Sequence, residues 1–167
     1  MASLGFLTFG LMRAPSGYPA VRGFELRIAA TYARAADAPG FLGSYAEGTQ
    51  TDVSRPARWA DPAYDGRCAI TVTRWTDLQA VHDFAFGPAH AGVMRRGHVW
   101  MERGDWPTHV AWWLADDETS SLGDAARRYD LLDSEGPTPD AFTFTSPYDA
   151  NGRPAPSCAP TGAPTRL

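Results

Sequence analysis

Apolar residues recur along the chain at two spacings, and these spacings predict a series of short strands and longer helices. A nearly unbroken apolar run over 4–12 is typical of a strand that is buried on both faces. In the strand over 68–75, Ile70 and Val72 fall on one face, while Thr71 and Thr73 fall on the other. The remaining strands are expected at 41–46, 108–115 and, as a short edge strand, 141–144.

Helical spacing of apolar residues fills the segments between these strands. It predicts helices over 19–36, 76–101 and 121–133. Thr76 is expected to cap the second helix, with Gln79 as its capping-box partner. That helix should stop or kink at Gly87-Pro88, because proline lacks the backbone N–H and clashes with the preceding turn.

Two segments lack such a period. Residues 47–67 form a long loop, which is either a lid or a surface excursion. From 146 onward the chain is rich in proline and small residues, and a disordered tail over 146–167 is expected. A chain of 167 residues thus corresponds to one domain over 1–145 followed by the tail.

The order of the elements is strand–helix–strand–strand–helix–strand, with one additional helix. This order predicts an α+β, ferredoxin-like split βαβ domain with helices on one face of the sheet. The strands are also apolar on the other face, which would have to be hidden from water. A second copy of the chain could hide it in a homodimer, and this would make the protein a dimeric α/β barrel.

Bulk composition excludes several classes of protein. The net charge of −4 gives no electrostatic basis for binding nucleic acid or an acidic membrane surface. Residues 1–12 are apolar but too short for a membrane span, and no basic region precedes them as in a signal peptide. Cys68 and Cys158 are distant from each other, which is typical of reduced thiols in a cytoplasmic protein.

Aromatic residues are abundant, with six Trp, six Tyr and eight Phe. Such side chains either fill a core or line a pocket for a flat ligand, and both interpretations stay open. The candidates for substrate binding are Tyr45 in the second strand, Trp59 in the long loop, Trp100, and Trp113 in the fourth strand.

His90 is the first candidate for chemistry, because it lies on the apolar side of a helix directly after the Gly-Pro break. Imidazole there can be a structural hydrogen-bonding group, a general acid or base, or an axial haem ligand. His109 is a rival if its strand face lines the interior. Arg95 and Arg96 are either solvated or hold an anionic oxygen over the pocket. No glycine-rich phosphate loop, nucleophile elbow or zinc motif is present in the sequence.

Three stretches carry a resemblance to a known family: FAFGPAHAGVMRRGHVWM after Trp75, the AWWLA strand, and LLDSEGPTPDAFTF. Over residues 4–145 the chain resembles the uncharacterised bacterial family known as domain of unknown function 3291. The resemblance implies the dimeric α/β barrel superfamily. That superfamily includes cofactor-free antibiotic-biosynthesis monooxygenases, polyketide cyclases, haem-degrading monooxygenases, and haem lyases or dehydratases.

We therefore expect a small cytoplasmic homodimer that binds a flat hydrophobic or aromatic molecule and acts on it by monooxygenase-, cyclase- or isomerase-like acid–base chemistry. The sequence leaves the cofactor open between none and haem. One alternative is a haem enzyme with His90 as the axial ligand of the iron. Another is a non-catalytic module for ligand binding or dimerisation.

Overall fold

The computed structural model describes residues 2–44, 55–115 and 121–158. The elements follow in chain order: β1 (Ser3–Leu11), α1 (Arg22–Ala36), β2 (Phe41–Ser44), the 3₁₀ turns η2 (Ala57–Trp59) and η3 (Pro62–Tyr64), β3 (Cys68–Trp75), α2 (Leu78–Phe86), α3 (Pro88–Trp100), β4 (His109–Leu114) and α4 (Leu122–Glu135).

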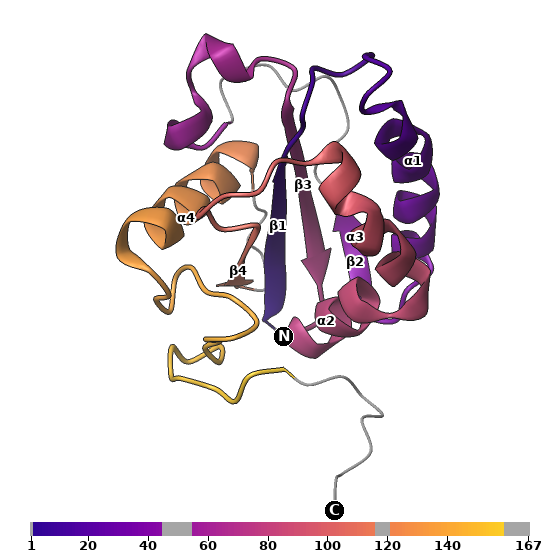
Figure 1. Ribbon diagram of the computed structural model, residues 1–167. Coiled ribbons are helices and arrows are strands. Elements are labelled where there is room, and N and C mark those ends of the chain that lie inside the picture. Colours follow the sequence, from indigo (N-terminus) through magenta and orange to yellow (C-terminus); the bar gives the residue numbers. More distant parts are fainter. Residues whose placement is uncertain (1, 45–54, 116–120, 159–167) are drawn as a thin grey trace, which may run out of the picture.

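The four strands form one antiparallel sheet in the order β2-β3-β1-β4 (Figure 1). Strand β1 lies at the centre, where Leu7 pairs with Val72 of β3 and Val110 of β4. The strand that follows α1 is thus separated from β1 by β3, which is the split βαβ arrangement. The predicted α+β, ferredoxin-like fold is confirmed.

Strand alternation divides the side chains between two faces of different character. One face carries fully buried apolar residues: Leu7, Phe9, Leu11, Val72, Val110, Trp112 and Leu114. The other face carries Phe6 and Thr8 from β1, Thr71 and Thr73 from β3, and His109 from β4. The predicted alternation in 68–75 and 108–115 is therefore confirmed.

Helix α4 covers the first of these faces, and we call that face the α4 face (Figure 1). Ala125, Tyr129 and Leu132 pack on it, and Val72, Val110 and Trp112 are 0% exposed within the single chain. This corrects the expectation that a second copy must hide an open apolar face, since the chain hides that face itself. A homodimer remains a prediction, but it can no longer be argued from an uncovered apolar face of the sheet.

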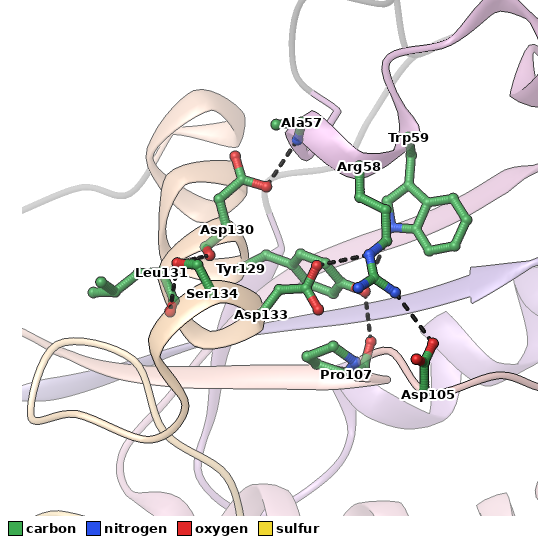
Figure 2. Close-up of polar contacts among 10 residues, drawn as sticks. All are labelled: Ala57, Arg58, Trp59, Asp105, Pro107, Tyr129, Asp130, Leu131, Asp133 and Ser134. Carbon is green, nitrogen blue, oxygen red and sulfur yellow. Dashed lines mark hydrogen bonds and ion pairs between the residues drawn. The ribbon is translucent and has the colours of Figure 1, made fainter.

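Polar contacts join α4 to the preceding loops (Figure 2). The buried hydroxyl of Tyr129 donates to the carbonyl oxygen of Pro107 at 2.8 Å. Arg58 pairs with Asp133 at 2.8 Å, and the backbone N–H of Ala57 donates to Asp130 at 2.8 Å. These contacts hold α4 in register on the sheet.

Helices α1, α2 and α3 lie over the opposite face (Figure 1). The predicted break is confirmed, because Gly87 ends α2 in an extended conformation and Pro88 begins α3. The predicted cap was wrong by one residue. Asp77, not Thr76, caps α2 by accepting a hydrogen bond from the N–H of Ala80 at 2.9 Å. A carboxylate in this place also complements the helix dipole.

The C-terminal segment packs against β4. Instead of the predicted edge strand, a single bridge links Phe142 to Ala111. The indole N–H of Trp113 donates to the carbonyl oxygen of Tyr148 at 2.8 Å. Residues 146–158 therefore take a defined course, although their composition predicted disorder. The boundary at 145 remains a prediction.

No helix in the described part of the chain has the length and apolar character needed to cross a membrane.

Replacing Tyr129 by Phe should lower the free energy of unfolding by about 1–2 kcal/mol, because the carbonyl of Pro107 then loses its donor and the buried indole N–H of Trp59 loses its acceptor. Urea denaturation of wild type and variant measures the difference. The exposed Tyr18 offers a matched control, and Tyr18→Phe should leave the midpoint unchanged. Equal midpoints for Tyr129→Phe and wild type would contradict the role given to this hydrogen bond.

Candidate functional site

A cavity of about 430 Å³ lies between the sheet and helices α1, α2 and α3, and we call it the interior cavity. This volume falls within the range of about 300–1,000 Å³ that is usual for small-molecule sites. Its walls are mostly apolar and aromatic, contributed by Phe6, Phe24, Ile28, Trp75, Val81, Phe84, Val93, Met94, Trp100, Met101 and Phe144. The lining predicts a flat, hydrophobic occupant.

Three threonines make a polar patch on the sheet side of the cavity. Thr8 and Thr71 are cross-strand partners, and their hydroxyl oxygens are 2.5 Å apart. One of the two protons makes that bond, and the other is left for a ligand. Thr73 is already engaged, because it donates to the carbonyl of Phe6 and accepts from the indole N–H of Trp75.

His90 lines the cavity from the first turn of α3. Its Nδ1 lies 2.9 Å from the carbonyl oxygen of Ala85, and its ring stacks on Phe84 at 5.3 Å. A carbonyl oxygen can only accept a hydrogen bond, so the contact assigns a proton to Nδ1 of His90. In the neutral tautomer with that proton, Nε2 carries the lone pair. His90 is thereby oriented to take up a proton or to bind a metal at Nε2.

His109 lines the same cavity from β4, but its nitrogens face other partners. Nε2 is 3.4 Å from the backbone N–H of Phe144, and Nδ1 is 3.4 Å from the hydroxyl of Thr108. The ring packs against Phe144 and Phe6. Burial lowers the pKa of His109 to about 4, so this imidazole is uncharged at neutral pH.

Trp100 closes the cavity where α3 ends. It is 5% exposed and packs against Phe24, and the guanidinium of Arg27 lies over its ring at 5.3 Å. Gly23 makes room for the indole, since a Cβ there would lie 2.9 Å from its Nε1. Trp100 is the one predicted tryptophan that the structure brings to the cavity.

The other aromatic candidates lie elsewhere. Trp59 is buried on the α4 face, where it stacks on Phe9 at 4.7 Å. Trp113 packs at the edge of the sheet under Tyr148 and does not line the cavity. Tyr45 falls outside the described residues.

Arg95 and Arg96 are exposed on α3 and do not line the interior cavity. Arg96 borders a separate groove between α1 and α3. Among the described residues that line the interior cavity, none is Arg or Lys.

Sequence reasoning missed the polar groups Thr8 and Tyr32 of this site. Thr8 interrupts the apolar run of β1 on the same face as Thr71. A polar residue within an apolar strand is the sequence signal that could have identified it. Tyr32 lines the cavity from α1, and burial raises the pKa of its hydroxyl. Tyr32 therefore stays protonated and is available as a hydrogen-bond donor at neutral pH.

A metal ion has no ready set of ligands here. Within the described ranges, no three His, Cys, Asp or Glu side chains are grouped as metal ligands would be.

Two solved structures are similar to this chain, both with low sequence identity. The first is SnoaB, a cofactor-independent oxygenase from Streptomyces nogalater, with 13% identity, coverage of 71% of this chain and 97% of that chain, and a TM-score of 0.46. The second is Rv0793 from Mycobacterium tuberculosis, with 11% identity, coverage of 71% of this chain and 99% of that chain, and a TM-score of 0.48.

Sequence comparison identifies the family to which the chain belongs. No curated protein matches the chain significantly. A family described as domain of unknown function (DUF3291) matches residues 3–158, which is nearly the whole chain and includes the segment after 145 that packs on β4. The chain belongs to the DUF3291 family.

Proposed function

We propose that the protein is a small enzyme that binds a flat hydrophobic or aromatic molecule in the interior cavity and transforms it by monooxygenase-, cyclase- or isomerase-like acid–base chemistry. The observation that carries this proposal is the combination of an apolar cavity of about 430 Å³ with an oriented imidazole in its wall. A homodimer and a cytoplasmic location remain predictions.

His90 is the proposed base. Its Nδ1–H is held by the carbonyl of Ala85, so Nε2 takes the proton from an acidic C–H or O–H of the substrate. His109 is the weaker candidate, because its pKa of about 4 makes it a poor acceptor near neutral pH. We assign His109 to packing and to hydrogen bonding in the uncharged state.

Negative charge that develops on a substrate oxygen would be met by neutral donors. The hydroxyl of Tyr32 and the remaining proton of the Thr8–Thr71 pair are the candidates, and no arginine is needed inside the cavity. Trp100 and Phe84 would hold the ring and exclude water. The substrate anion could then react in three ways. Reaction with O₂ would make the protein a monooxygenase, ring closure a cyclase, and reprotonation at another carbon an isomerase.

The haem alternative fits the site only in part. Nε2 of His90 has the orientation that an axial ligand needs, because the other ring nitrogen is fixed by a carbonyl. A haem also brings two propionates, and no described Arg or Lys lines the cavity to pair with them. Haem remains a second candidate, which His90 would hold through Nε2.

Filling the cavity should weaken binding without unfolding the protein. Gly97 lines the cavity, and a Cβ there would meet nothing within 4 Å. Gly97→Phe should therefore weaken binding of the neutral dye N-phenyl-1-naphthylamine by at least about tenfold, while the Tm should not fall, because glycine disfavours helices. Gly97→Ala is the matched control, since it makes the same change in the backbone and leaves most of the volume. Unchanged dye affinity in Gly97→Phe would count against the cavity as the binding site.

Anthrone is a flat probe for the chemistry, because loss of one proton lets it react with O₂ to give anthraquinone and water. Wild-type protein should accelerate O₂ consumption, and His90→Ala should slow it by at least about 100-fold. An oxygen electrode measures both rates, and the exposed His98→Ala is the control. A full rate in His90→Ala would refute the assigned base. Binding without any acceleration, across anthrones and phenols, would favour the non-catalytic module.

Stability should depend on pH through His109. Its folded pKa of about 4 lies below the value of 6.5 expected when unfolded, so the unfolded chain gains the proton first. The contribution is fully present above pH 6.5 and is lost as pH falls toward 4, by up to about 3 kcal/mol. Urea denaturation at several pH values should show a shallower fall in the free energy of unfolding for His109→Phe, which keeps the aromatic packing. An equally steep fall in His109→Phe would contradict the buried neutral imidazole.

A further inference from the structure

A second hollow lies on the outer side of the helical layer. This groove of about 590 Å³ runs between α1 and α3, and we call it the α1–α3 groove. Apolar and cationic side chains line it together: Leu26, Arg27, Ala30, Thr31, Arg34, Pro88, Gly92, Val93 and Arg96. The proposed acid–base chemistry does not use this groove.

The two helices are basic although the protein is acidic. The chain carries a net charge of −4, with 19 acidic residues. Helices α1 and α3 nevertheless contain five arginines, namely Arg22, Arg27, Arg34, Arg95 and Arg96, and one carboxylate, Glu25. That carboxylate is engaged by the hydroxyl of Ser16 and the N–H of Gly17. The groove therefore attracts anions.

Two of the lining arginines, Arg27 and Arg96, have donors that can reach a ligand in the groove. Arg27 is held in place, because one terminal nitrogen donates to the carbonyl of Gly23 at 2.6 Å and its guanidinium lies over Trp100. Its remaining N–H groups are left for a ligand. Arg96 is exposed, and within the described ranges no carboxylate lies within ion-pairing distance of it. Both can turn donors toward an anion in the groove.

The groove and the interior cavity share a wall. Thr31 of α1 and Val93 of α3 line both hollows. Trp100 also connects them, since it lines the cavity and carries Arg27 over its ring. A ligand that passes between α1 and α3 beside Thr31 and Val93 could keep its ring in the cavity and place a charged group among the arginines.

A second copy of the chain is disfavoured as the occupant. A two-fold contact through α1 and α3 would place the arginines of one copy against the same arginines of the other. The exposed apolar side chains beside them, Leu26 and Met94, are better matched to the apolar part of an amphipathic anion.

We propose that the substrate is an amphipathic aromatic acid, whose apolar rings occupy the interior cavity and whose anionic group is bound by Arg27 and Arg96 in the α1–α3 groove. This inference rests on the proposed function, because it takes the interior cavity as the binding site. It narrows the substrate class from flat hydrophobic molecules to those that carry a carboxylate or a similar anion.

A matched pair of dyes tests the inference. 8-Anilinonaphthalene-1-sulfonate and N-phenyl-1-naphthylamine share the same ring system, and only the first is an anion. Fluorescence titration should show that Arg96→Gln weakens the anionic dye about three- to tenfold and changes the neutral dye less than twofold. Arg96→Lys should restore part of the difference. Arg127→Gln removes the same charge on α4, beyond the sheet, and should affect neither dye selectively (Figure 1).

The outcomes separate this inference from the proposed function. Equal weakening of both dyes in Arg96→Gln, or no weakening of the anionic dye, overturns the anion site. If the cavity-filling Gly97→Phe leaves both dyes bound, the proposed function fails. A loss confined to the anionic dye in Arg96→Gln would then still assign an anion site to the groove, without the link to the cavity.

Discussion

Helix α4 packs on one face of the central sheet, and the rest of the structure depends on that contact. It removes Val72, Val110 and Trp112 from water, and the buried hydroxyl of Tyr129 is satisfied by the carbonyl of Pro107. Because α4 covers that face within one chain, the sheet is held in place from one side. The other three helices can then leave space on the opposite face without loss of the fold.

The interior cavity follows from the composition of that second face. Threonines and a glycine stand there among the aromatic side chains, where larger apolar residues would have filled the gap. Native cores are packed densely, so a void of this size costs stability unless a ligand occupies it. Two imidazoles border it in different surroundings. His90 is oriented by the carbonyl of Ala85, whereas His109 is desolvated and its pKa is lowered to about 4. The roles that we propose for the two histidines rest on these different surroundings.

The sequence predicted the order of elements and the alternation of the strands, because hydrophobic spacing is a local property. It placed Thr71 and Thr73 on one face and located the helix break at Gly87-Pro88, and both are observed. It could not predict which element covers which face, because that depends on contacts far apart in the chain. For the same reason the sequence left open whether Trp59 lines a pocket or fills a core, and it packs on the α4 face. The sequence left open whether Arg95 and Arg96 are solvated or reach over the pocket, and both are exposed on α3 outside the interior cavity. The course of 146–158 was missed because its hydrogen bond to Trp113 is not visible in composition.

The most direct test is a crystal structure of the protein with N-phenyl-1-naphthylamine. We expect the dye to lie between the sheet and α3, in contact with Phe84 and Trp100 and beside the imidazole of His90. Dye bound only on the outer surface, with side chains filling the space between the sheet and the helices, would contradict it.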